Sequence, residues 1–152
     1  MKKAIFSIFF SLLFGLSGIV TAQKDNISSE ETLNYINGKF QGNYVLKNKR
    51  GVLVIEVYKD GKINRTDEVA IEDLNPENVY YAPDEKAIVV RCIANDCISR
   101  KTVVPKTKGQ FSRINFAGEF DKKTQNGLLN AFEHLIRTFQ DNKYKSLKPF
   151  EE

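Results

Sequence analysis

Two cysteines and a single histidine are the residues of this 152-residue chain best suited to redox, metal or general-base chemistry. Cys92 and Cys97 enclose the pair Ala94-Asn95, which can form the two-residue turn of a β-hairpin. In that register the cysteines face each other as a non-hydrogen-bonded pair, where Cα atoms come close enough for a disulfide. We therefore predict a Cys92–Cys97 disulfide, whose stabilising effect is modest because the closed loop is short.

A redox-active pair and a zinc site are the alternative interpretations of Cys92 and Cys97. The spacing is C-x-x-x-x-C, whereas redox pairs of the thioredoxin type use C-x-x-C at the start of a helix. A four-ligand zinc site would have to recruit carboxylates, because His134 is the only histidine. We therefore predict that Cys92 and Cys97 form a structural disulfide, and that the protein binds neither a metal nor a cofactor.

His134 is the only imidazole available for general-base catalysis. It lies between Glu133 and Leu135 at the edge of an apolar helical stripe, so we expect it on a helix flank or in solvent. No G-x-S-x-G turn accompanies it, and paired cysteines would leave no free thiol nucleophile. The sequence therefore predicts no catalytic residue, and a small hydrolase stays open only as a hypothesis.

Acidic residues gather in the middle of the chain. Two carboxyl groups that flank a glycosidic bond could hydrolyse it, but such sites usually lie in deep clefts with aromatic platforms, and the chain has no tryptophan. The sequence contains neither a P-loop nor an EF-hand calcium loop. We interpret the following acids as solvated loop residues: Glu68, Glu72, Asp73, Glu77, Asp84 and Glu85.

Residues 1–22 have the order of a secretory signal peptide. Lys2 and Lys3 precede an uncharged apolar run from Ala4 to Leu16, and small or polar residues close the segment up to Ala22. Serines and glycines interrupt this run, whereas a membrane span needs roughly 20 continuous apolar residues. We expect cleavage after Ala22 and export of a bacterial protein to the periplasm or the medium, with an uncleaved anchor as the alternative.

Composition and charge favour one soluble domain over residues 23–140 and argue against a nucleic-acid surface. Hydrophobic residues make up 41% of the chain, enough for a packed core, and no repeat or low-complexity linker divides it. Loss of Lys2 and Lys3 would reduce the net charge from +4 to +2, and basic residues are dispersed among acidic ones. We interpret the densest basic run, residues 101–108, as a solvated loop, with contact to an anionic partner as the alternative. Its lysines are Lys101, Lys106 and Lys108.

A helix is predicted at each end of this domain. Ser28 and Glu31 match a capping box that starts a short N-terminal helix. Asp121 or Thr124 starts the final helix, which is the clearest helix in the sequence. Its apolar face comprises Leu128, Leu129, Phe132, Leu135, Ile136 and Phe139. Residues 141–152 are predicted to form a flexible polar tail.

Between these helices the pattern changes to that of antiparallel strands. Asp60-Gly61 is predicted to form the turn of one hairpin, and Ala94-Asn95 the turn of a second. The predicted strands cover residues 51–58, 63–71, 78–81, 87–93, 97–103 and 110–116. Because each strand follows the previous one after a short turn, a meander order is expected.

This order of elements predicts an α+β fold: a short N-terminal helix, an antiparallel meander sheet of about six or seven strands, and a C-terminal amphipathic helix. From Tyr44 to Phe139 it resembles the pleckstrin-homology-like arrangement, in which a C-terminal helix plugs a strongly bent sheet. The stretch from Leu128 to Ile136 also resembles the ending of small exported bacterial proteins. These resemblances imply an architecture and carry no ligand with them.

For function, the sequence favours a noncatalytic exported binding or protein-interaction domain. Its site would lie on the sheet face or in a groove beside the C-terminal helix, and would take a protein or a small apolar ligand. The alternatives are an envelope-associated structural protein that pairs through an exposed strand edge, and a small hydrolase. No nucleic-acid partner is expected.

Overall fold

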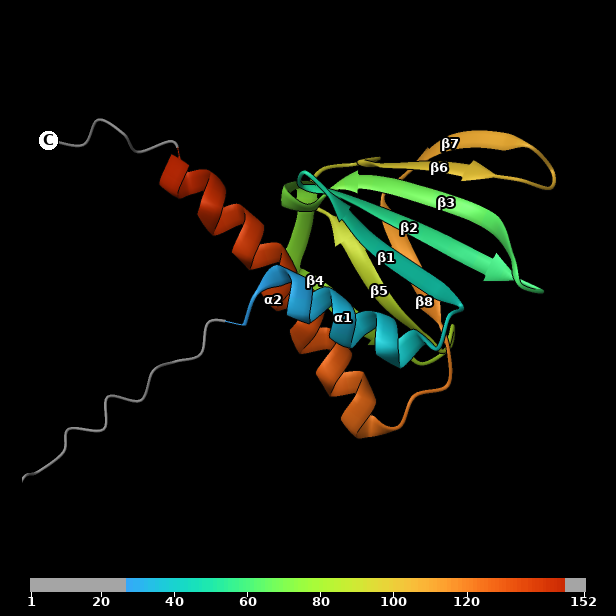
Figure 1. Cartoon of the computed structure of the whole chain (residues 1–152), viewed down its shortest axis with the longest axis horizontal. Coiled ribbons are helices and arrows are strands. Elements are labelled where there is room, and N and C mark those ends of the chain that lie inside the picture. Colours follow the sequence, from blue (N-terminus) through green and yellow to red (C-terminus); the bar gives the residue numbers. More distant parts are fainter. Residues whose placement is uncertain (1–26, 147–152) are drawn as a thin grey trace, which may run out of the picture.

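The computed structural model describes residues 27–146. The predicted signal peptide, residues 1–22, and its cleavage site lie outside the described residues, as do residues 147–152 of the predicted tail. Within residues 27–146 two helices and two antiparallel sheets form one body, with the helices gathered on one side (Figure 1). The predicted α+β class is confirmed.

The strands divide between a five-stranded and a three-stranded sheet (Figure 1). The larger sheet has the spatial order β1 (Tyr44–Lys49), β2 (Val52–Lys59), β3 (Lys62–Ala70), β6 (Ile98–Thr102) and β7 (Thr107–Phe111). The smaller sheet has the order β4 (Leu74–Ala82), β5 (Ala87–Cys92) and β8 (Arg113–Ala117). A short 3-10 helix, η1 (Ile71–Asp73), carries the chain from β3 to β4.

Turn chemistry places the first strands as the sequence indicates. Asp60 and Gly61 join β2 to β3 with φ angles of 51° and 72°, which are the left-handed values that a two-residue hairpin turn requires. Arg50 and Gly51 join β1 to β2 in the same way, with φ angles of 54° and 86°. The glycine in each pair adopts this conformation without the steric cost that a Cβ would bring.

The predicted second hairpin is wrong, although its two strands exist. β5 pairs with β4 and β8, whereas β6 pairs with β3 and β7, so residues 93–97 carry the chain from one sheet to the other. The physical reason is that both edges of β5 are already occupied at its end: Leu74 lies opposite Cys92, and the Cys92 N–H donates to the Ser112 carbonyl, so no edge is left for β6. The predicted strand 110–116 likewise splits at Ser112 into β7 and β8, and eight strands result.

The two helices begin where the caps predict. In α1 (Ser29–Phe40) the Ser28 hydroxyl accepts a hydrogen bond from the Glu31 N–H, and the Glu31 carboxylate accepts one from the Ser28 N–H. Asp121 caps α2 (Lys122–Ser146), because its carboxylate accepts the Thr124 N–H at 2.7 Å. Helix α2 thus extends six residues into the segment predicted as a tail. Neither helix within residues 27–146 has the length and apolar character to cross a bilayer.

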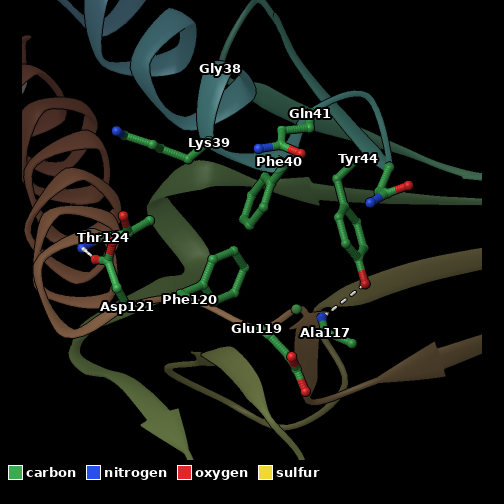
Figure 2. Close-up of a pocket in the computed structure, with 12 residues that line it drawn as sticks. Gly38, Lys39, Phe40, Gln41, Tyr44, Ala117, Glu119, Phe120, Asp121 and Thr124 are labelled. Carbon is green, nitrogen blue, oxygen red and sulfur yellow. Dashed lines mark hydrogen bonds between the residues drawn. The ribbon is translucent and has the colours of Figure 1, made fainter.

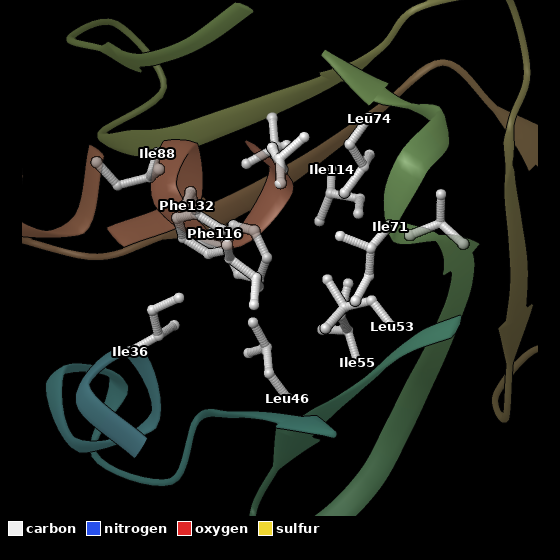
Figure 3. Close-up of a cluster of buried hydrophobic side chains, with 14 of the residues drawn as sticks. Ile36, Leu46, Leu53, Ile55, Ile71, Leu74, Ile88, Ile114, Phe116 and Phe132 are labelled. Carbon is white, nitrogen blue, oxygen red and sulfur yellow. The ribbon is translucent and has the colours of Figure 1, made fainter. Parts of the chain in front are cut away.

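The core lies between the two sheets and the paired helices (Figure 3). Helix α1 packs on α2 and β1, while α2 also covers β4, β5 and η1. Fully buried members of the core include Ile36, Leu53, Ile55, Ile71, Leu74, Ile88, Ile114, Phe116, Leu128, Phe132 and Leu135. The core residues within the described part of the chain lie between Leu33 and Phe139, so a chain that starts at Gln23 retains every one of these.

Candidate functional site

The two cysteines lie at disulfide distance in the segment that links the sheets. Their sulfur atoms are 2.05 Å apart and their Cα atoms 5.9 Å apart. Cys92 ends β5 and Cys97 precedes β6, so the bond ties the three-stranded sheet to the five-stranded one. No described residue carries a free thiol.

His134 and the predicted loop acids are not brought together. His134 is exposed, and its Nε2 lies 3.0 Å from the carbonyl oxygen of Ile27. Three of the acids instead form ion pairs with bases in three different places: Glu68 with Lys101, Glu77 with Arg137 and Glu85 with Arg113. Over residues 27–146 no group of three histidine, cysteine or carboxylate side chains is placed to hold a metal ion.

A cavity of about 280 Å³ is lined by strands β3, β6 and β7 of the larger sheet and by β8 of the smaller sheet. We call it the arginine cavity. It is lined by Arg65, Arg100, Phe111, Arg113 and Asn115. These side chains come from four different strands, β3, β6, β7 and β8, so the fold of both sheets is needed to assemble them.

Strand register places the charges of this cavity. Residues 65 and 67 lie on the same face of β3 as the core residue Val69, because side chains alternate along a strand. Asp67 lies opposite Arg100 on β6, and its fully buried carboxylate accepts hydrogen bonds from Nε at 2.7 Å and Nη2 at 2.9 Å. Arg65 Nε is 3.4 Å from the same carboxylate, within ion-pair distance but outside hydrogen-bond geometry.

The remaining walls are also held in place. The Arg100 guanidinium lies over the Phe111 ring, 4.2 Å from its centroid, so both groups stabilise each other's position. The carboxylate of Glu85 accepts hydrogen bonds from Arg113 and from the side-chain amide of Asn115. Because Glu85 holds the amide nitrogen of Asn115, the amide oxygen is directed elsewhere.

Three buried polar atoms at the arginine cavity have no hydrogen-bond partner among the described residues: Arg65 Nε, Arg65 Nη2 and Asn115 Oδ1. Burial lowers the pKa of Arg65 from its ordinary value, while Asp67 opposes this effect. Three guanidinium groups meet two carboxylates here, which leaves one positive charge in excess. These three atoms have hydrogen-bonding capacity that the described residues do not use, and because each is almost fully covered, a ligand would reach them only after neighbouring side chains move.

A second hollow, of about 400 Å³, lies beside the C-terminal end of α1 (Figure 2). Two of its polar groups are engaged already, since the Tyr44 hydroxyl accepts the Ala117 N–H at 2.8 Å and Asp121 accepts the Thr124 N–H. Phe40 and Phe120 form its apolar wall. Lys39 and Gln41 also line this hollow, so it too presents polar side chains.

A third hollow, of about 500 Å³, is a mainly apolar groove between α1 and α2. Ile27, Tyr35 and Ala131 contribute to its lining, together with His134 and Glu31. The Tyr35 side chain fills the space beside Gly127, because a Cβ on this glycine would lie 2.1 Å from the Tyr35 hydroxyl. The groove lies beside the C-terminal helix, one of the two surfaces where the sequence predicts a binding site, the other being the sheet face.

Comparison of the chain with protein-family models, curated proteins and solved structures gave no match. The site therefore rests on its own geometry. The sequence interpretation missed Arg65, Asp67 and Arg100, although one signal was present. Arg65 and Asp67 are in phase with Val69 and Ile71, which places two charged residues on the apolar side of a strand.

Proposed function

We propose that this protein is a noncatalytic binding domain whose arginine cavity takes a small anionic ligand. The observation that carries the proposal is Arg65, which has two buried N–H donors without an acceptor. Unmet donors of a buried charged group cost free energy, and a bound anion would remove that cost. The excess positive charge of the cavity favours the same class of ligand.

The geometry narrows the ligand further. Guanidinium groups bind carboxylate and phosphate oxygens through two parallel hydrogen bonds, and Arg65 offers Nε and Nη2 for this purpose. The Asn115 amide oxygen would accept a hydrogen bond from a hydroxyl or N–H on the same ligand. A volume of about 280 Å³ is at the lower end for small-molecule sites. A carboxylate or phosphate that carries a neighbouring donor fits these requirements.

The same residues argue for binding without chemistry. Arginine stays protonated in proteins, so Arg65, Arg100 and Arg113 supply charge and donors and cannot act as bases. Asp67 and Glu85 are both occupied by arginines. His134 lies on α2, exposed and outside the lining of the cavity. The carboxylates of Asp67 and Glu85 and the imidazole of His134 are therefore not placed to move a proton on the ligand.

Nuclear magnetic resonance titration of the arginine Nε–H signals tests the proposal. Lactate and inorganic phosphate are the probes, with sodium chloride at equal ionic strength as the reference. We expect a saturable shift of the Arg65 signal, and a dissociation constant raised at least tenfold by Arg65→Gln and by the charge-retaining Arg65→Lys. Arg50→Asn, in the β1–β2 turn, removes the same charge elsewhere and should have no effect. Shifts that chloride reproduces, or that survive Arg65→Gln, would refute the site.

The groove between the helices is a second candidate, for a small apolar ligand. The observation that supports this groove is its apolar lining, which includes the exposed side chains of Ile27 and Tyr35. Nile red fluorescence provides the test: Ala131→Glu should abolish binding of the dye, whereas Glu30→Gln, outside the lining, should leave it unchanged. Dye binding that Ala131→Glu does not alter would place the apolar site elsewhere.

We infer that the domain acts after export. A disulfide persists in oxidising compartments such as the periplasm, and Cys92 and Cys97 are at bonding distance. Cell fractionation and the mass of the purified protein test this inference. A mature N-terminus at Gln23 in the periplasm or medium would support it, and a reduced cytoplasmic protein with residues 1–22 would overturn it. The pleckstrin-homology-like resemblance stays a prediction.

A further inference from the structure

Two neighbouring turns carry aliphatic side chains into solvent at the end of the larger sheet away from the helices (Figure 1). Ile63 follows the β2–β3 turn and is 39% exposed, while Val103 and Val104 in the β6–β7 turn are 53% and 79% exposed. We call these three residues the aliphatic tip. Residues of both turns line a common hollow, so the three side chains belong to one surface.

Hydrogen bonds hold the two turns together. The Val103 N–H donates to the Asn64 carbonyl at 2.9 Å, which fixes one turn against the other. Within the β6–β7 turn, the Thr102 hydroxyl donates to the Pro105 carbonyl and accepts the Thr107 N–H. The aliphatic tip is therefore presented in a fixed shape, and little conformational entropy would be lost when it is buried.

Lysines surround the aliphatic tip in an arrangement that costs stability. Lys59 lies directly opposite Lys62, and Lys101 directly opposite Lys108. Like charges in directly opposite positions of an antiparallel pair are destabilising. Lys106 adds a fifth positive charge.

Few acidic residues lie close enough to balance the positive charge of these lysines. Asp60 lies in the β2–β3 turn, and Glu68 contacts Lys101 at 3.5 Å. Within residues 27–146 none of the other four lysines has an ion-pair partner. The aliphatic tip is thus bordered by five lysines, of which only Lys101 has an ion-pair partner among the described residues.

We propose that the aliphatic tip docks on the surface of a lipid bilayer that contains anionic lipids. The lysines would contact lipid phosphates, and Val103, Val104 and Ile63 would enter the interfacial region. Polyanions that lack apolar groups, such as polyglutamate, would use the lysines alone and leave Val104 in water. Dependence on both Val104 and the lysines therefore separates a bilayer from those partners.

Vesicle co-sedimentation tests the proposal with the chain from Gln23, which retains all core residues and lacks the apolar run at residues 4–16. We expect binding to vesicles of phosphatidylcholine with 30% phosphatidylglycerol, weaker binding as salt rises, and no binding to phosphatidylcholine alone. The double variant Lys59→Gln/Lys62→Gln should bind about 25-fold more weakly, since each lysine near the surface contributes about fivefold. Val104→Asp should weaken binding about tenfold.

Matched controls isolate the tip. Lys122→Gln/Lys123→Gln removes two exposed lysines at the start of α2, and Ile93→Asp changes an exposed aliphatic residue at the opposite end of β6. Both variants should bind vesicles like the unmodified chain. Arg65→Gln should bind equally well, which separates docking by the tip from binding in the arginine cavity.

Tryptophan fluorescence gives a direct readout of insertion, because the chain contains no tryptophan. Val104→Trp should show a blue shift of its emission with phosphatidylglycerol vesicles, and Ile93→Trp should not. Absence of binding to the anionic vesicles, equal loss in the tip and control variants, or binding that is insensitive to Val104→Asp would each overturn the proposal. The last outcome, together with binding to polyglutamate, would assign the lysines to an acidic protein partner.

Discussion

The carboxylate of Asp67 and the guanidinium of Arg100 lie opposite each other on β3 and β6 and form two hydrogen bonds, at 2.7 and 2.9 Å. Asp67 is fully buried, and Arg100 is largely so. A buried pair of this kind adds little net stability, because desolvation offsets the attraction, but the loss of one partner is expensive. Asp67 also lies within ion-pair distance of Arg65, so one carboxylate positions two sides of the arginine cavity.

Replacement of Asp67 should therefore be among the most damaging single changes in the chain. We expect Asp67→Asn to lower the free energy of unfolding by about 3–5 kcal/mol, because two buried guanidinium groups lose their counter-charge. Urea denaturation at pH 7 measures this loss. The neighbouring Glu68, exposed and paired loosely with Lys101, is the control, and Glu68→Gln should cost less than about 1 kcal/mol. Equal effects of the two variants would contradict this account of the buried pair.

The disulfide should contribute a modest part of the stability. Cys92 and Cys97 are five positions apart, and closing so short a loop stabilises a fold by about 2 kcal/mol in the chain-entropy account. We expect the double variant Cys92→Ala/Cys97→Ala to fold, with its free energy of unfolding reduced by about this amount. Chemical denaturation of both forms measures the difference.

The same variants test the alternative interpretations of the cysteine pair. A reductant should destabilise the unmodified chain and leave the double alanine variant unchanged, and the folded protein should show no thiols in a thiol titration. Zinc released from the purified protein, or two titratable thiols in the native state, would instead favour a metal or redox role.

Local signals were sufficient to predict much of the fold. The capping box at Ser28 and the Asp60-Gly61 turn each depend on residues a few positions apart, and both are present in the structure. The final helix follows from its apolar period. The second hairpin could not be predicted correctly, because a strand such as β5 shows that it is buried on both faces without showing which strands will flank it.

The residues of the candidate site could not be identified from the sequence, because the order of the strands in the two sheets was not known. The pairing of Cys92 with Cys97 was predicted from a hairpin register that the structure does not contain and from the expected export, yet the two sulfur atoms lie at disulfide distance. Arg65, Arg100 and Asn115 come from three strands of two sheets, and only the strand order brings them to one cavity. The lysines of residues 101–108 were noted as a basic run, but their alignment with Lys59 and Lys62 required the pairing of β3 with β6.

The capping box of α1 should make part of the stability sensitive to acid. The Ser28 N–H, and next the Ser28 hydroxyl, donate to Glu31 and lower the pKa of its carboxyl below the ordinary 4.5. A lowered folded pKa means that this contribution is complete above the ordinary value and is lost as pH falls through the lowered value. We expect the unmodified chain to be more stable than Glu31→Gln at pH 7 and the difference to close as pH falls through the lowered pKa of Glu31. Glu30→Gln removes a charge from the same turn without affecting the capping box, and a matching pH profile for it would argue against this origin.

Asn37 protects one edge of the larger sheet, and its removal should expose that edge. β1 has a partner strand on one side only, and on the other side the Asn37 side chain accepts the Leu46 N–H at 2.8 Å and donates to the Leu46 carbonyl at 2.9 Å. Asn37→Ala leaves both backbone groups without a partner, so we expect a loss of about 1–3 kcal/mol in urea denaturation. Because an unpaired edge can accept a strand from another chain, sedimentation velocity should also show self-association that grows with concentration. The exposed Asn34, one turn earlier on α1, is the matched control, and Asn34→Ala should remain monomeric and fully stable. A monomeric Asn37→Ala variant of unchanged stability would show that the β1 edge needs no protection from α1.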